Sequence, residues 1–127
     1  SNLNVVVTGG DLRHHTASLI GRLAERILQE IYVDKVFLGV SAISLKRGMS
    51  TGTIAEADLK KAAIAAGKEV IAVTDSSKFG KDGFAIVGGF DSVDVLVTDS
   101  GIPTEFKQTL EEQGIEVIIV EVPEDRG

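Results

Sequence analysis

Short apolar runs alternate with helical patterns along almost the whole sequence, and this alternation limits the possible folds more than any other feature. The sequence predicts strands at residues 5–7, 35–40, 69–75, 94–99 and 115–122, with a short strand or extended segment at 84–87. Most positions in these runs are apolar, which is typical of strands covered on both faces. Strands separated by helices favour right-handed crossovers, so we expect a mostly parallel α/β sheet with helices on both faces.

Helix signals fill the gaps between several of these strands. Apolar residues at three- and four-residue spacing predict a first helix through residues 20–31. Thr53 and Glu56 have the spacing of a capping box, so a second helix is expected to begin there. Gly67 lies where a left-handed C-cap residue is expected to end that helix.

Two further segments complete the predicted organisation. A third helix is expected to open at Pro103 or Thr104 and to end at Gly114, with Phe106 and Leu110 facing inward. Residues 41–53 are rich in serine, threonine and glycine, and they are predicted to form a loop. We find no internal repeat and no linker, so the chain is expected to form a single domain.

Composition excludes several classes of protein. With 43% hydrophobic residues, 127 residues are enough to build a core. The absence of cysteine excludes disulfides and thiol catalysis, and the adjacent His14 and His15 do not make a zinc site. The apolar runs are too short to span a membrane, and no signal-peptide pattern is present. We therefore expect a cytoplasmic protein without a membrane, metal or cofactor partner.

The charge of the chain argues against direct contact with nucleic acid. The formal net charge is −6. From residue 91 onward there are ten acidic residues, opposed only by Lys107 and Arg126. A duplex-binding surface needs clustered lysine and arginine against phosphates, and no such cluster is found.

Polar or glycine-rich segments follow four of the predicted strands: TGGD, GVSAIS, TDSSKFG and TDSGIP. In open α/β sheets, ligands bind at the carboxyl ends of strands, at a topological switch point. Small residues allow close approach, serine hydroxyls and backbone amides donate to phosphate oxygens, and a lysine adds a point charge. Together they suit a phosphorylated small molecule, with candidate contacts at Lys78, Ser76, Ser77, Gly9, Gly10, Gly39 and Ser41.

Each of these residues also has a purely structural interpretation. Lys78 can be a solvated turn lysine, Ser76 and Ser77 can satisfy turn amides, and Gly9-Gly10 can make a tight turn. Neither a dinucleotide fingerprint nor a P-loop is present. Asp75 and Asp99 are candidate acid–base groups, yet no catalytic triad and no clear carboxylate pair is found.

Four segments, in one order, resemble the carboxyl-terminal effector domain of DeoR-type transcriptional regulators. They are VVVTGGDLRHHTASLIG, DKVFLGVSAISLKRGMSTGT, AVTDSSKFG and VDVLVTD, and the resemblance runs from residue 5 to about residue 122. It implies a repressor domain that senses a phosphorylated sugar or sugar-derived metabolite and forms homo-oligomers. It also implies a Rossmann-like fold similar to ribose-5-phosphate isomerase, with Lys78 at the phosphosugar site and Gly9-Gly10 beside it.

The resemblance further implies that residues 1–127 are a fragment of the effector domain. Family members carry a winged helix-turn-helix and an additional strand-helix portion ahead of these segments, so DNA would be bound only through a domain absent from this sequence. The alternative function is a phosphosugar isomerase of the same fold. Such isomerases resemble G-A-D-E-I-D where this chain has GVSAIS, with Ser41, Ala42 and Ser44 at the acidic positions. Binding without turnover is therefore favoured.

Overall fold

The computed structural model describes residues 5–8 and 32–121 of the chain. The helix predicted at 20–31, the two histidines, Gly9-Gly10 and the last six residues lie outside that part. No helix within the described residues is long and apolar enough to cross a membrane. In chain order the elements are β1 (Val5–Thr8), β2 (Val33–Gly39), β3 (Ala42–Ser44), β4 (Gly48–Thr51), α2 (Ile54–Ala66), β5 (Gly67–Val73), the 3-10 turn η1 (Ser76–Lys78), β6 (Ala85–Gly88), the 3-10 turn η2 (Phe90–Ser92), β7 (Val95–Asp99), α3 (Thr104–Glu112) and β8 (Glu116–Val120).

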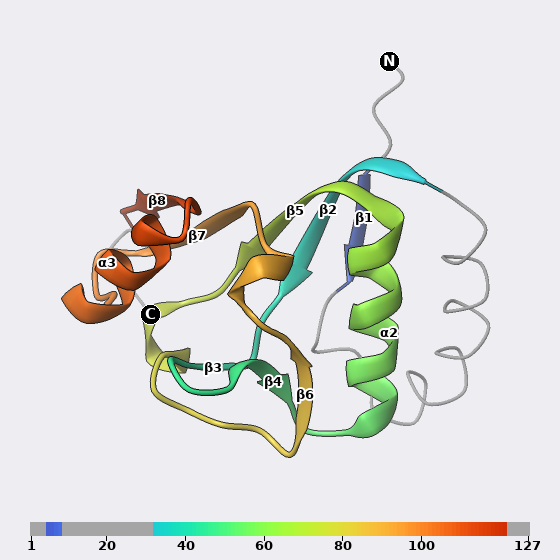
Figure 1. Ribbon diagram of the computed structural model, residues 1–127, viewed down its shortest axis with the longest axis horizontal. Coiled ribbons are helices and arrows are strands. Elements are labelled where there is room, and N and C mark those ends of the chain that lie inside the picture. The colour runs from blue at the N-terminus through green and yellow to red at the C-terminus, as the bar shows by residue number, and fades with distance from the viewer. Residues whose placement is uncertain (1–4, 9–31, 122–127) are drawn as a thin grey trace, which may run out of the picture.

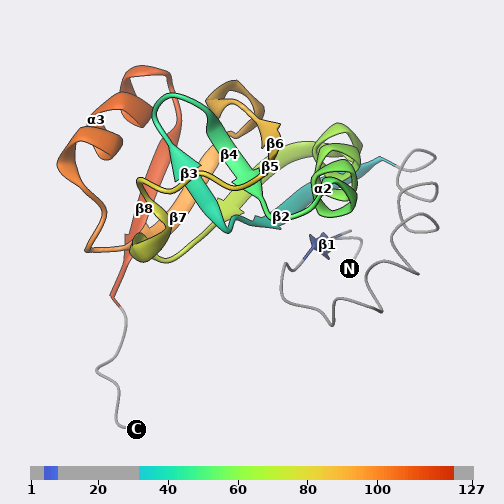
Figure 2. The same cartoon turned by 90° about the horizontal axis from the view of Figure 1, so that it is seen from below.

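The larger sheet is parallel throughout, as the alternation of strands and helices predicts. Its five strands lie in the order β1-β2-β5-β7-β8, which is also their order in the sequence. The described crossovers, from β2 to β5, β7 and β8, therefore move in the same direction along the sheet, and right-handed crossovers of that kind lie on one face. Figure 2 shows α2, α3 and the smaller sheet together on one side of the large sheet.

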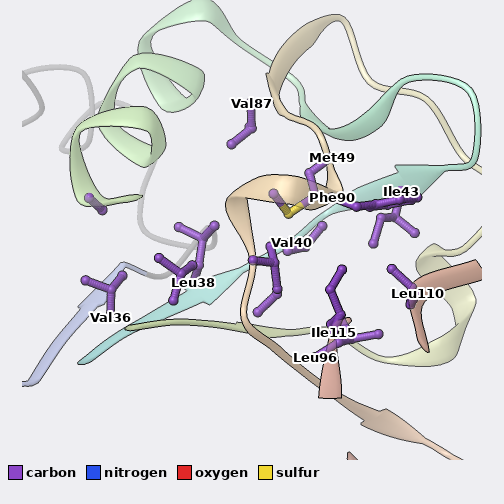
Figure 3. Packing of buried hydrophobic residues seen from close by; sticks show 14 of the residues in the cluster. Val36, Leu38, Val40, Ile43, Met49, Val87, Phe90, Leu96, Leu110 and Ile115 are labelled. Carbon is purple, nitrogen blue, oxygen red and sulfur yellow. The ribbon is translucent and has the colours of Figure 1, made fainter. Parts of the chain in front are cut away.

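The core lies between that face and the two helices. Val36 and Leu38 of β2 point into it, as do Ala72 of β5 and Leu96 of β7, and all four are almost completely buried. Ala63 from α2 and Leu110 from α3 join the same cluster, so both helices pack on one shared core. Figure 3 shows Met49 of β4 and Phe90 of η2 among these residues.

The opposite face of the sheet is apolar as well. Register places Val97 beside Ile118 on this face, and Val120 follows two residues later. Val73, Ile118 and Val120 are 41%, 39% and 45% exposed. Both described helices lie on the other face, so covering of both faces by helices stays a prediction.

The prediction of a loop at residues 41–53 is wrong, because most of this segment forms strands. β3 and β4 are antiparallel and pair with β6 in a second, three-stranded sheet (Figure 1). Every residue of β3 and β4 is buried, although several are serine, threonine or glycine. Tertiary contacts satisfy their hydroxyls: Ser44 Oγ donates to Asp82 Oδ1, and Ser50 Oγ accepts from the Gly83 amide.

Of the four predicted helix ends within the described residues, three are confirmed, including the start of α3 at Thr104 after Pro103, and one is wrong. Thr53 Oγ1 accepts from the Glu56 amide at 3.1 Å and caps α2, and Gly114 is left-handed (φ +86°) just after α3. Gly67 is not a left-handed cap, because its backbone is extended (φ −99°, ψ 139°) and it opens β5. A Cβ at Gly67 would lie 2.6 Å from Val36 Cγ2, so glycine serves close packing of strand on strand.

Candidate functional site

A cavity of about 600 Å³ opens at the carboxyl ends of β2, β5 and β7. Of the residues that the sequence predicted for a ligand site, Lys78, Gly39 and Ser41 line it. Ser76 and Ser77 are not among the lining residues, and Gly9 and Gly10 lie outside the described part. The full lining combines two cations, two carboxylates, three hydroxyls and aliphatic groups: Gly39, Val40, Ser41, Lys60, Val73, Thr74, Asp75, Lys78, Val97, Thr98, Asp99 and Val120.

Lys78 stands at the rim of this cavity on the turn that follows β5. Asp75 opens the turn, and its Oδ1 accepts from the Ser77 amide at 2.9 Å and from the Ser77 hydroxyl. The Ser77 hydroxyl bond, the Ser77 amide and the nearby Lys78 ammonium lower the pKa of Asp75. Lys78 Nζ lies 3.5 Å from Asp75 Oδ2 and about one third of its side chain is exposed, so it is oriented but remains accessible.

Asp99 fastens the same turn to the neighbouring strand. Its Oδ2 accepts from the Ser76 amide and its Oδ1 from the Gly101 amide, each at 2.8 Å. Hydrogen bonds from the Ser76 side chain and amide, and from Gly101, lower the pKa of Asp99. The amides of Ser76 and Ser77 are therefore already donated to carboxylates, and these two serines shape the turn that carries Lys78.

The far end of the turn is attached to the small sheet and to α3. The amides of Gly80 and Lys81 both donate to the Ile43 carbonyl oxygen, at 2.7 and 3.2 Å, and Phe79 forms a parallel bridge with Ile43. The Phe79 ring packs edge-on against Phe106, with 4.9 Å between ring centroids. Movement of Lys78 would therefore change the contacts of its turn with β3 and with the first turn of α3.

Lys60 is a lining residue that the sequence interpretation missed. It lies on the buried stripe of α2, between Ala57 and Ala63, and only 5% of it is exposed. Its Nζ donates to the Gly39 carbonyl oxygen at 2.5 Å. Burial lowers the pKa of Lys60, opposed by the nearby Glu56 carboxylate. The signal in the sequence was its spacing of three residues from each of two core alanines, where an aliphatic residue is expected.

Thr98 was also missed, although it belongs to a repeated tripeptide. The sequence Val-Thr-Asp lies at the carboxyl ends of both neighbouring strands: residues 97–99 are the last three of β7, and residues 73–75 begin at the last residue of β5. In each copy the aspartate accepts from the amide two residues later. The two threonines differ. Thr74 Oγ1 donates to the Val40 carbonyl oxygen at 2.9 Å, whereas Thr98 Oγ1 is buried without a hydrogen-bond partner among the described residues.

This geometry defines a class of protein: a domain with a parallel α/β sheet and, at its carboxyl edge, a cavity that combines aliphatic walls with charged and hydroxyl groups, as small-ligand sites do. A family model described as the DeoR C-terminal sensor domain matches residues 1–100. The chain belongs to this family of sensor domains, which confirms the resemblance seen in the sequence.

Individual relatives agree with the family. A protein of Escherichia coli O157:H7 named "Putative aga operon transcriptional repressor" is 38% identical over 118 residues, covering 93% of this chain and 44% of its own length. The uncharacterized HTH-type transcriptional regulator YulB of Bacillus subtilis is 35% identical, with 94% and 46% covered. The HTH-type transcriptional regulator GlpR of Haloferax volcanii is 30% identical, with 90% and 45% covered. The chain thus spans slightly less than half the length of these relatives.

Proposed function

We propose that this chain is the effector-sensing part of a cytoplasmic transcriptional repressor and that its effector is a phosphorylated sugar or sugar-derived metabolite. The observation that carries the proposal is the composition of the cavity: Lys60 and Lys78 supply positive charge, while Ser41, Thr74 and Thr98 supply hydroxyls. A sugar phosphate presents the matching groups, an anion at one end and several hydroxyls along a short carbon chain. Lysine binds phosphate as a point charge, and the apolar valines suit the carbon skeleton.

Lys78 provides the first test. In the full-length regulator, Lys78→Ala should weaken binding of the effector by about tenfold to a hundredfold, because a hydrogen bond to a charged group contributes roughly 1.5–3 kcal/mol. Calorimetric titration with ribose 5-phosphate, glucose 6-phosphate, fructose 6-phosphate and fructose 1-phosphate measures the affinities. Stability should change little, because the Lys78 side chain is partly solvated and its ion pair is at the surface.

Lys81→Ala is the matched control for this variant. Lys81 is an exposed lysine three residues further along that does not line the cavity, and its hydrogen bond to Ile43 uses the backbone amide. It should bind like wild type. If Lys78→Ala and Lys81→Ala both retain wild-type affinity, Lys78 is only a turn residue. If none of the four sugar phosphates binds wild type, the proposed class of effector is wrong.

A phosphosugar isomerase of the same fold is the second candidate. Its acidic positions are taken here by Ser41, which hydrogen-bonds Thr51 Oγ1, by Ala42, and by Ser44, which hydrogen-bonds Asp82. The two carboxylates that do line the cavity, Asp75 and Asp99, have lowered pKa values because hydrogen bonds stabilise their charged forms. A carboxylate with a low pKa is a weak general base at neutral pH.

We therefore expect no isomerisation of sugar phosphates. The assay mixes the protein with ribose 5-phosphate and several hexose phosphates and follows conversion between aldose and ketose by NMR. Conversion should stay at the rate of a sample without protein. Turnover that disappears in Asp75→Asn or Asp99→Asn would restore the enzyme interpretation.

The rest of the regulator completes the proposal. DNA would be bound through a helix-turn-helix domain outside this sequence, and the effector domain would assemble as a homo-oligomer with a Rossmann-like fold similar to ribose-5-phosphate isomerase. The names of two of the relatives above, as HTH-type regulators, support the first point. Light scattering during size-exclusion chromatography tests the second, and a monomer at every concentration would contradict it.

A further inference from the structure

Two buried polar groups in the cavity have fewer partners than their chemistry requires. A lysine ammonium carries three donors, and among the described residues Lys60 Nζ has one partner, the Gly39 carbonyl oxygen. Thr98 is 2% exposed, and its Oγ1 has no partner there at all. Buried polar groups in folded proteins are almost always hydrogen-bonded, so each missing partner calls for an explanation.

The Val-Thr-Asp repeat provides an internal comparison. Thr74 and Thr98 occupy equivalent places at the ends of neighbouring strands, and the aspartate after each makes the same local bond. The hydroxyl of Thr74 is used within the fold, because it joins β5 to the Val40 carbonyl at the end of β2. The hydroxyl of Thr98 makes no hydrogen bond to any described residue, yet it is buried where Thr98 lines the cavity.

Lys60 is similarly unexplained by packing. The rest of the buried stripe on α2 is alanine, which lets the helix lie close to the sheet. A lysine in that stripe places a cation beneath the cavity and loses much of its hydration in doing so. An anion in the cavity would favour the charged ammonium and occupy its remaining donors.

Resting on the proposed function, we propose that Lys60 and Thr98 form the recognition floor of the effector cavity, with Lys60 Nζ binding the phosphate group and Thr98 Oγ1 binding a sugar hydroxyl. The floor stands on α2 and β7, whereas Lys78 at the rim stands on a turn. Residues on regular elements hold a ligand more precisely than residues on loops, so the floor determines which ligand fits.

The experiment titrates three probes into the full-length regulator: the sugar phosphate that binds wild type most tightly, its deoxy analogues lacking one hydroxyl each, and inorganic phosphate. Thr98→Val should weaken the sugar phosphate about threefold to tenfold and leave inorganic phosphate unchanged. It should also bind one deoxy analogue as tightly as wild type does, which identifies the hydroxyl. Lys60→Met should weaken both the sugar phosphate and inorganic phosphate, by about tenfold to a hundredfold.

Thermal unfolding separates binding from folding. Thr98→Val should unfold at or above the wild-type temperature, because it removes a buried hydroxyl without a partner. Thr74→Val is the matched control, and it should unfold at a lower temperature because it leaves the Val40 carbonyl unpaired. If Lys60→Met does not fold, Lys60→Gln replaces it, since glutamine keeps a donor for the Gly39 carbonyl without the charge.

The outcomes distinguish this inference from the proposed function. If a sugar phosphate binds wild type and loses affinity in Lys78→Ala, but binds Thr98→Val and the folded Lys60 variant as tightly as wild type, the recognition floor is wrong and the function stands. If only one of the two variants weakens binding, the proposal that Lys60 and Thr98 together form the recognition floor is wrong. If no sugar phosphate binds wild type, both proposals fall.

Discussion

At the scale of single residues, two aspartates hold the edge of the cavity in shape. Asp75 and Asp99 each accept backbone amides in the turn that follows them, and Asp99 also reaches the turn after the neighbouring strand. Both pKa values are lowered, so both carboxylates are ionised at neutral pH. As the pH falls, the unfolded chain therefore takes up protons at these two positions before the native state does.

Asp99→Asn should flatten the dependence of stability on acid. The contribution of Asp99 is fully present above the unfolded pKa of about 3.8 and is lost as the pH falls through its lower folded value. Asparagine lacks the negative charge that strengthens the bonds to the Ser76 and Gly101 amides, so the variant is less stable at neutral pH. Because asparagine has no proton to gain, the variant loses less stability on acidification. Urea unfolding at steps from about pH 6 to about pH 3 measures this slope. Equal slopes for wild type and variant would show that the bonds to Ser76 and Gly101 contribute nothing.

The sequence allowed part of this site to be predicted at the residue scale. Lys78 and Ser41 follow predicted strands and Gly39 lies near the end of one, and carboxyl ends meet at one edge of a parallel sheet, so their convergence could be expected. Lys60 could not be placed, because a helix pattern does not say where the tip of a long side chain emerges. Thr98 could not be separated from Thr74, because the difference between them lies in which carbonyl each hydroxyl reaches.

At the scale of elements, the hairpin of β3 and β4 depends on one glycine. Gly48 opens β4 opposite Ser44 and has φ +75°. A Cβ there would lie 2.5 Å from the Gly88 carbonyl oxygen and 2.9 Å from Gly89 Cα. Both contacts are to backbone, so neither neighbour can move aside cheaply.

Gly48→Ala should destabilise the fold by at least about 2 kcal/mol. Left-handed backbone costs an alanine about 1–2 kcal/mol, and overpacking adds about 1–3 kcal/mol. Gly114→Ala is the matched control, because Gly114 is also left-handed (φ +86°) but has open space around its missing Cβ. It should lose only the first of the two contributions. Chemical unfolding of both variants gives the comparison, and equal losses would mean that β4 and β6 separate to admit the methyl group.

The type of an element could be predicted where its burial requires a regular pattern of apolar residues in the sequence. The parallel strands are apolar runs, and β2, β5 and β7 place their buried residues against the shared core, while α3 carries Phe106 and Leu110 on one side. β3 and β4 are three and four residues long and contain serine, threonine and glycine, so their composition is that of a loop. Only the tertiary partners of their hydroxyls, Asp82 and Gly83, make such residues suitable for a buried strand.

At the scale of the whole molecule, the five described strands of the large sheet follow one another in sequence order, without a reversal of direction. The sequence predicted a ligand site at a topological switch point, yet the cavity lies at the carboxyl edge of strands that all advance the same way. The cavity is instead bounded by the turn that carries Lys78, which is tied to β3 through Ile43 and to α3 through Phe79 and Phe106.

Binding at the cavity should therefore be detected at a distance. On addition of the effector, amide hydrogen exchange should slow at Gly80 and Lys81, in the β3–β4 hairpin, and in the first turn of α3, since the turn is bonded or packed to each of them. Phe79→Leu keeps an apolar side chain but removes the ring contact. It should abolish the slowing in α3 and retain it in the hairpin. Exchange that slows only in the residues lining the cavity would contradict this coupling.

The attachment of Lys78 to a turn, with Lys60 and Thr98 on α2 and β7, has a consequence for how such a sensor can diversify. A ligand shifts a conformational equilibrium only by the difference in its affinity for the two states. Contacts that are the same in both states set which metabolite is held and how tightly, whereas contacts that change set what the regulator does in response. Substitutions on the helix and strand can then alter the choice of metabolite while the response is preserved, and substitutions around Ile43 and Phe79 can alter the response while the metabolite stays the same.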